Sequence, residues 1–202
     1  MLSEIILKME GISKSFPGVR ALHNVDFVLR KGEVHALMGE NGAGKSTLIK
    51  VLTGVYEKDA GQNVLYGRPV HFKSPQEALS MGIGAVFQEI ALCPNLTVAE
   101  NMFIGRSRNS VVQWKKMNAK AAQILSSLGI PASPTQELSS CSIAVQQMIA
   151  IARAIDMDCK ILILDEPTSS LDEDEVKKLF ALMRELKARG VGIIFITHFI
   201  DQ

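Results

Sequence analysis

A glycine-rich stretch in the first quarter of the chain has the residue types and spacing needed to bind phosphate. Its defining residues, in the pattern G-x-x-x-x-G-K-[ST], are Gly39, Gly44, Lys45 and Ser46, and Asn41, Gly42 and Thr47 complete the expected contacts. Glycines in such a loop let backbone N–H groups surround phosphate oxygens, and the N-terminus of the following helix adds its positive end. The lysine would reach the β- and γ-phosphates, and the serine hydroxyl would bind Mg²⁺. The stretch therefore predicts a site for a nucleoside triphosphate, in preference to a glycine-rich turn with a solvated lysine.

Two adjacent carboxylates, Asp165 and Glu166, follow the apolar run 161–164. In proteins with this kind of loop, the first carboxylate at the end of such a strand holds Mg²⁺. The second is placed to orient and polarise the attacking water. A polar turn that merely ends a strand is the alternative, and the presence of the phosphate-binding pattern favours the chemical interpretation.

Strands and helices are expected to alternate around these residues. Residues 34–38 are predicted to form a short buried strand leading into the loop, and residues 48–52 a helix that ends at Gly54. The other predicted strands are 4–9, 25–30, 63–66, 69–72, 83–87, 161–164 and 191–197. The other predicted helices follow capping boxes at Ser74 and Thr97 or cover 118–128, 142–155 and 172–188.

This order predicts an α/β fold with a mainly parallel sheet, in the manner of a P-loop NTPase, with an N-terminal antiparallel β subdomain and a helical insert. We expect one nucleotide-binding domain over residues 1–202. Its ATPase core and β subdomain would be 1–88 and 156–202, and its helical subdomain 89–155.

The composition suits a cytosolic protein with one sizeable core. Hydrophobic residues make up 47% of the 202 residues, and 22 Lys and Arg against 21 Asp and Glu leave a formal charge of +1. This balance gives no overall attraction to nucleic acid. The three cysteines are odd in number and lack metal-binding spacing, so reduced thiols are expected. The sequence contains neither an apolar run of about 20 residues nor a signal-peptide pattern, so any membrane association would come through a partner.

Several motifs together resemble the ATP-binding-cassette ATPase domain over essentially the whole chain. They are Phe16, GENGAGKST, Gln88, SIAVQQMIAIARAI at 142–155, ILILDEPTSSLD at 161–172 and ITH at 196–198. The loop sequence, LTVAENMFIGR at 96–106 and the HFIDQ ending look like the sugar-importer ATPases of bacteria. Residues 142–156 are most similar to the galactofuranose-importer branch.

The resemblance implies roles for five further residues. Phe16 would stack on adenine, although it could instead be a core residue at a turn. Gln88 would touch the Mg²⁺ or water shell, and His198 would hydrogen-bond the γ-phosphate; the alternatives are a surface glutamine and a strand-end histidine. Ser142 and Asp172 would face a partner cassette, and Asp172 could also serve as a helix N-cap.

The chain departs from the family pattern in two places. Where the signature normally reads L-S-G-G-Q, residues 141–145 read Cys-Ser-Ile-Ala-Val, so the serine remains but both glycines are replaced. The added Cβ atoms limit how closely a γ-phosphate can approach, which puts turnover of the partner's ATP in doubt. The second departure is the end at Gln202, from which we expect a fragment that lacks edge strands, dimerises weakly and is followed in the full polypeptide by a second cassette.

The family resemblance implies an ATPase that powers sugar uptake. Lys45, Mg²⁺ and the N–H groups of the loop would lower the barrier by positioning and charge neutralisation, with Glu166 assisting hydrolysis. The implied partners are a second cassette, a transmembrane permease and, indirectly, a periplasmic or extracellular sugar-binding protein, and the implied location is the cytoplasmic face of the membrane.

Two other functions remain open. A soluble cassette ATPase of DNA repair or translation would be indicated by a basic patch with aromatic residues. Arg106, Arg108, Lys115 and Lys116 near Trp114 form a small candidate patch. A regulatory nucleotide-binding module without hydrolysis is the other alternative, because of the altered signature.

Overall fold

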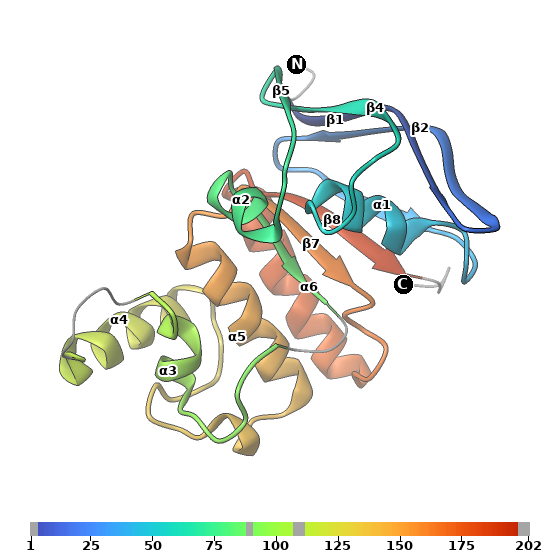
Figure 1. The fold of residues 1–202 in the computed structure, drawn as a ribbon. Helices are drawn as coiled ribbons and strands as arrows, with labels where there is room; N and C mark the ends of the chain where they lie inside the picture. Colours follow the sequence, from blue (N-terminus) through green and yellow to red (C-terminus); the bar gives the residue numbers. More distant parts are fainter. Residues whose placement is uncertain (1–3, 88–90, 107–111, 198–202) are drawn as a thin grey trace. The chain divides into compact units, whose positions relative to one another are not determined.

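The structure, a computed structural model, describes residues 4–87, 91–106 and 112–197. These residues form two compact units (Figure 1). Unit 1 contains the residues up to 85 together with 159–166 and those from 186 onward, and unit 2 contains 86–158 and 167–185.

An antiparallel sheet in unit 1 has the strand order β2-β1-β4-β5. Its strands are β1 (Ile5–Phe16), β2 (Val19–Arg30), β4 (Ala60–Leu65) and β5 (Arg68–Val70). β1 and β2 form a hairpin in which Phe16 pairs with Val19 across the turn, and Gly18 provides the positive φ of 79° that this turn uses. The predicted antiparallel subdomain is confirmed, but its first two strands are longer than the apolar pattern indicated.

A second sheet in unit 1 has the order β3-β8-β7-β6. Its strands are β3 (Val34–Met38), β8 (Gly192–Thr197), β7 (Ile161–Asp165) and β6 (Ile83–Val86). β8 runs parallel to both β3 and β7. All of β8 and the first four residues of β7 are buried, as expected for strands of a parallel sheet that are covered on both faces.

The expectation that residues 34–38 form a buried strand is wrong. The bounds are correct, but the exposed fraction is 38% for Val34 and 46% for Met38. Within the described residues β3 lies at the edge of its sheet and pairs with β8. An apolar run therefore predicted the strand without revealing that one of its faces, which carries Val34, Ala36 and Met38, is exposed.

The core of unit 1 joins side chains from both sheets to the helix α1 (Lys45–Leu52). Ile49 and Leu52 of α1 are almost fully buried, as are Leu7 of β1 and Ile163 of β7. Burial of each such side chain contributes about 1.5–3 kcal/mol. The same cluster holds Ala78 of the short helix α2 (Pro75–Ser80). The helix that begins at the glycine-rich loop is therefore fixed by its apolar face.

Unit 2 is mainly helical. Its elements are α3 (Val98–Phe103), α4 (Trp114–Ser127), a 3₁₀ turn (Leu138–Ser140), α5 (Ile143–Asp156) and most of α6 (Glu173–Ala188). α3 packs against both α4 and α5, burying Met102, Leu125 and Ile149. α4 begins four residues before the predicted start of its helix.

The two predicted capping boxes differ in outcome. At Thr97 both bonds of the box are present, so this prediction is confirmed. At Ser74 the hydroxyl accepts from the N–H of Glu77, but the Glu77 carboxylate accepts from the N–H of Lys73 instead of Ser74. The second half of that box is therefore shifted by one residue.

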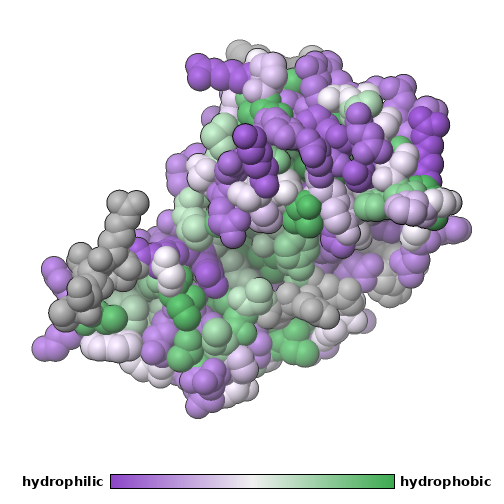
Figure 2. All heavy atoms as spheres, in the orientation of Figure 1, coloured by the Kyte–Doolittle hydropathy of each residue, from purple (hydrophilic) through white to green (hydrophobic). Residues whose placement is uncertain are grey.

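Figure 2 shows hydrophilic side chains over most of the visible face of the antiparallel sheet, and hydrophobic side chains exposed among the helices α3 and α4. In the described residues, helices long and apolar enough to cross a membrane are absent.

Candidate nucleotide-binding site

The glycine-rich loop leads directly from β3 into α1 in unit 1. Three of its glycines have positive φ, namely 153° at Gly39, 86° at Gly42 and 88° at Gly44. Gly44 is doubly constrained, because a Cβ there would also lie 2.6 Å from the carbonyl oxygen of Ala21. Gly44 is the N-cap of α1 and makes no side-chain cap. The first N–H groups of α1 are thus not capped by a side chain at this position, which suits an anion.

The side chain of Lys45 folds back across the loop. Its ammonium donates hydrogen bonds to the carbonyl oxygens of Gly39 at 2.5 Å and Glu40 at 2.9 Å. These bonds hold the positive charge over the turn formed by residues 39–44, where the predicted phosphates would bind.

The strand register brings the loop and the acidic pair to the same end of the parallel sheet. Met38, the last residue of β3, pairs with Thr197 of β8, and Asp165, the last residue of β7, pairs with Ile196. The ends of β3 and β7 are therefore level to within one residue, and since neighbouring strands are about 4.8 Å apart, they are separated by roughly 10 Å. β8 lies between them, so β7, which ends at the acidic pair, does not pair directly with β3, which leads into the loop.

The carboxyl group of Asp165 is partly buried, and charges of both signs act on it. Burial raises its pKa, and the neighbouring Glu166 raises it further. Lys45 and Lys50, both on α1, act in the opposite direction. Asp165 and the loop lysine are therefore within electrostatic reach of each other.

Glu166 has an unusual backbone conformation. Its φ is +48°, in the left-handed region that residues other than glycine rarely adopt. Its N–H donates to the carbonyl oxygen of Ile196 at 3.0 Å, which continues the ladder with β8 while the chain turns away. Strained backbone of this kind often occurs at functional sites.

The donor set fits Mg²⁺. This ion is usually held by one or two carboxylates together with phosphate oxygens and water, and not by a complete cage of protein ligands. Asp165 and the hydroxyl of Ser46 could supply such a partial set, and a cation would relieve the repulsion between Asp165 and Glu166. Clusters of three or more His, Cys, Asp or Glu side chains able to hold a metal are absent from the part of the chain that the structure describes.

Phe16 ends β1 and is only half-buried, so it is not part of the fully buried core. Its ring makes an edge-to-face contact with Tyr56, with the centroids 5.2 Å apart. The sequence analysis missed Tyr56 and also Lys50, whose ammonium lies 5.4 Å from the centroid of the Tyr56 ring. The available signal for Lys50 was its place on the same short helix as Lys45.

In unit 2, the two residues expected to face a partner cassette both cap helices. Ser142 is the N-cap of α5 and accepts from the N–H of Val145 at 3.4 Å. The Asp172 carboxylate accepts from the N–H of Glu175 at 2.8 Å, and the Glu175 carboxylate accepts from the N–H of Asp172. The N-cap interpretation of Asp172 is thus confirmed, and contact of both residues with a second cassette stays a prediction.

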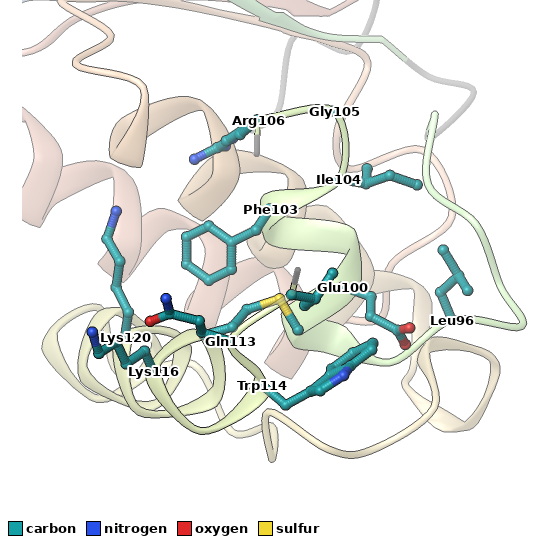
Figure 3. Close-up of a pocket in the computed structure, with 12 residues that line it drawn as sticks. Leu96, Glu100, Phe103, Ile104, Gly105, Arg106, Gln113, Trp114, Lys116 and Lys120 are labelled. Atoms are coloured by element: carbon teal, nitrogen blue, oxygen red, sulfur yellow. The ribbon is translucent and has the colours of Figure 1, made fainter. Parts of the chain in front are cut away.

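A pocket of about 570 Å³ lies beside α3 and α4 in unit 2 (Figure 3). Its apolar lining residues are Leu96, Phe103, Ile104, Val112, Trp114 and Met117. Three lining residues, Arg106, Lys116 and Lys120, are cationic, but Arg106 and Lys120 both bind the carboxylate of Asp156, at 2.6 and 2.9 Å. The basic patch suggested by the sequence is therefore partly neutralised within the unit itself.

Three residues of interest lie outside the described residues. They are Gln88, His198 and Arg108. The predicted roles of Gln88 near Mg²⁺ and of His198 at the γ-phosphate remain predictions.

Fold and site together define a P-loop nucleotide-binding protein, and comparison with known proteins gives its family. The family described as "ABC transporter" matches residues 22–169. Among solved structures, the ADP conformation of an ATP-binding cassette of an ABC transporter has a TM-score of 0.89 at 29% identity, covering 98% of this chain and 83% of that one. A cassette in a dimeric post-hydrolysis state with bound ADP and phosphate has a TM-score of 0.79 at 25% identity, covering 97% and 89%.

Curated relatives match at higher identity. The galactofuranose transporter ATP-binding protein of Escherichia coli K12 is 54% identical, covering 98% of this chain and 40% of that protein. The fructose import ATP-binding protein of Bifidobacterium longum is 51% identical, covering 98% and 39%. A ribose import ATP-binding protein of Hahella chejuensis is 47% identical, covering 98% and 40%. The chain belongs to the ABC transporter family, and it spans about two fifths of the length of these relatives.

Proposed function

We propose that the chain is the N-terminal nucleotide-binding domain of a bacterial sugar-import ATPase and that it binds and hydrolyses ATP to power uptake through a membrane permease. The observation that carries this proposal is the register across β8, which places the ends of β3 and β7 level and brings the glycine-rich loop and Asp165–Glu166 to one end of the sheet. Identities of 47–54% to galactofuranose, fructose and ribose import proteins support the substrate class.

In the proposed mechanism, α1 and its loop bind the triphosphate. The N–H groups at the start of α1 and the ammonium of Lys45 neutralise the β- and γ-phosphates, and Phe16 stacks on the adenine. Ser46 and Asp165, with Gln88, would hold Mg²⁺, which would polarise the phosphoryl oxygens when bound. Glu166 orients the attacking water and accepts its proton, and His198 hydrogen-bonds the γ-phosphate.

Hydrolysis in this proposal needs a second cassette, expected in the C-terminal half of the same polypeptide. Ser142, at the N-terminus of α5, would face the ATP of that partner. The next residue, Ile143, is 48% exposed, so a bulky side chain stands where the family's signature has glycine. This exposure supports the prediction that turnover of the ATP facing Ser142 is weaker than turnover at the loop of this chain.

The helical unit is proposed to transmit the motion to the permease on the cytoplasmic face of the membrane. Ile104 and Trp114 beside the pocket of unit 2 are 43% and 53% exposed, and an exposed apolar group of this kind suits contact with a protein partner. A sugar-binding protein would take part indirectly, through the permease. The engagement of Arg106 by Asp156 makes nucleic acid the weaker alternative.

The experiment that tests the proposal uses the complete protein assembled with its permease. Glu166→Gln removes the base but keeps the size and polarity of the side chain, so ATP affinity should stay within about 3-fold while turnover falls by about 100-fold or more. Glu173→Gln, an exposed acid at the start of α6, serves as the control. Unchanged turnover in Glu166→Gln would remove this residue from the mechanism.

A further inference from the structure

The end of β1 that carries Phe16 is weakly held by its own sheet. The last register pair between β1 and β4 in the described residues is Ser13 with Ala60. The pairing with β2 is irregular on both sides of Lys14. From Lys14 to Phe16 the strand is thus half of a two-stranded ribbon, an arrangement with little stability of its own.

Asp59 binds three successive residues at this end of the strand. Its carboxylate accepts from the N–H of Ser15 at 2.6 Å and from the ammonium of Lys14 at 2.9 Å. Its own N–H donates to the carbonyl oxygen of Ser13 at 2.9 Å. The bond from Lys14 and the N–H of Ser15 lower the pKa of the Asp59 carboxyl, which favours the charged form that these bonds require.

Lys14 in turn reaches the aromatic ring. Its ammonium lies 5.6 Å from the centroid of Phe16, within the range of a cation–π contact. The ammonium is held in place by Asp59, since it also forms the ion pair with that carboxylate.

Tyr56 supports the Phe16 ring from the same segment. The two rings meet edge to face at an interplanar angle of 71°. The N–H of Tyr56 donates to the carbonyl oxygen of Lys50 at 3.0 Å, and the ammonium of Lys50 lies over the Tyr56 ring. Tyr56 is therefore attached to the C-terminal half of α1, whose N-terminus is the phosphate-binding end.

The connection between α1 and this segment is closely packed. A Cβ at Gly54 would lie 2.8 Å from the Cβ of Phe72 and 3.0 Å from its carbonyl oxygen. Gly54 also has a φ of +73°. The segment that carries Tyr56 and Asp59 thus has little freedom to move relative to α1.

From these contacts we propose that Tyr56 and Asp59 are positioning residues, which hold the Phe16 ring in a fixed relation to the phosphate-binding loop and so determine how tightly the base of a nucleotide is bound. The inference rests on the proposed function, in which Phe16 stacks on the base. It adds two residues that do not touch the nucleotide themselves. Their loss should weaken binding of the base and leave binding of the phosphates unaffected.

The test compares two ligands on the full chain in the presence of Mg²⁺, by calorimetry. ATP has a base, and inorganic tripolyphosphate has only the phosphates. Tyr56→Leu should weaken ATP binding by about 2- to 10-fold, the range expected for loss of one aromatic pair, and leave the tripolyphosphate affinity unchanged. Tyr56→Phe retains the ring and should behave like the unmodified chain.

Asp59 provides a second, independent variant with a matched control. Asp59→Ala removes the hydrogen bonds that the Asp59 carboxylate accepts from Lys14 and Ser15 of β1. It should lower the ATP affinity without altering the tripolyphosphate affinity. Glu57→Ala, two residues away and 80% exposed, removes an acid that approaches only His71 in the described contacts, and should change neither. If Tyr56→Leu does not fold, Asp59→Ala tests the inference by the same comparison of ATP affinity with tripolyphosphate affinity.

The outcomes separate this inference from the proposed function. If Tyr56→Leu or Asp59→Ala loses the same affinity for both ligands, or loses affinity for neither, the positioning role is overturned. ATP binding by the unmodified chain is not affected by that result. If the unmodified chain binds neither ATP nor tripolyphosphate, the proposed function itself fails.

Discussion

Lys45 counteracts the rise in the pKa of Asp165 across the end of the parallel sheet. One residue comes from the first turn of α1 and the other from the last position of β7, and they are 120 positions apart in the chain. Their charges are opposite in sign, so Lys45 favours the ionised form of Asp165. Without a bound cation this compensation is incomplete, because burial and Glu166 still raise the pKa of Asp165.

The raised pKa of Asp165 predicts a pH-dependent gain in stability when its charge is removed. Because the folded chain binds this proton more tightly than the unfolded chain, ionised Asp165 costs stability above the unfolded pKa of about 3.9. Asp165→Asn should therefore raise the thermal midpoint of the metal-free chain at pH 7 by about 1–3 °C. The difference should vanish as the pH falls below about 4, where both side chains are neutral.

Thermal unfolding followed by circular dichroism across this pH range measures the effect of Asp165→Asn. Asp174→Asn is the matched control, because its carboxylate is 80% exposed. A midpoint that is lower in Asp165→Asn than in the parent chain at pH 7 would contradict the electrostatic account.

Two glycines of the loop separate backbone strain from steric overlap. Gly42 and Gly44 have nearly the same φ, 86° and 88°. A Cβ on Gly42 meets nothing within 4 Å, whereas one on Gly44 would lie 2.6 Å from the oxygen of Ala21. Gly42→Ala should cost about 1–2 kcal/mol of unfolding free energy from φ alone. Gly44→Ala should cost about 1–3 kcal/mol more, from the overlap.

Urea unfolding of the two alanine variants measures this difference. Equal losses would mean that the start of α1 can move away from Ala21, and that the loop is held less firmly than the contacts imply.

The ion pairs of Asp156 predict that its replacement destabilises the chain much more than replacement of Asp174, another aspartate of unit 2. Asp156 binds both Arg106 and Lys120, and its side chain is only 12% exposed. Asp156→Ala leaves the partly buried Arg106 without this partner and should destabilise the chain by about 2–4 kcal/mol. Asp174→Ala breaks an exposed pair with Lys177 and should change stability by less than about 0.5 kcal/mol.

Urea unfolding at low and high salt checks this prediction. The cost of Asp156→Ala should persist at high salt, since partly buried pairs are screened much less than exposed ones. A cost as small as that of Asp174→Ala would mean that Arg106 finds another partner when the carboxylate is lost.

Local patterns predicted local structure well. The bounds of β3 and the capping box at Thr97 both follow from short-range chemistry, namely an apolar run and a hydroxyl cap. The fold class and the family also follow, since several motifs agree in order and spacing, and the family comparison confirms both.

Non-local relationships could not be predicted in the same way. The apolar run 34–38 does not reveal which strands flank it, so the exposure of Val34 and Met38 was not foreseen. The position of β8 between β3 and β7 is likewise a matter of strand order. Phe16 and Tyr56 are in contact although they are 40 positions apart in the chain. A short sequence pattern cannot predict a contact over that separation.

The attachment of both Lys45 and the Tyr56 segment to α1 has one more consequence. The five positions from Lys45 to Lys50 span about 7.5 Å along this helix, and in the proposed function they would connect the group that holds the phosphates to the groups that hold the aromatic ring. Since this spacer is helical, a ligand whose ring and phosphate tail are a different distance apart would engage only one of the two ends, so the proposed site would discriminate among anions by their length.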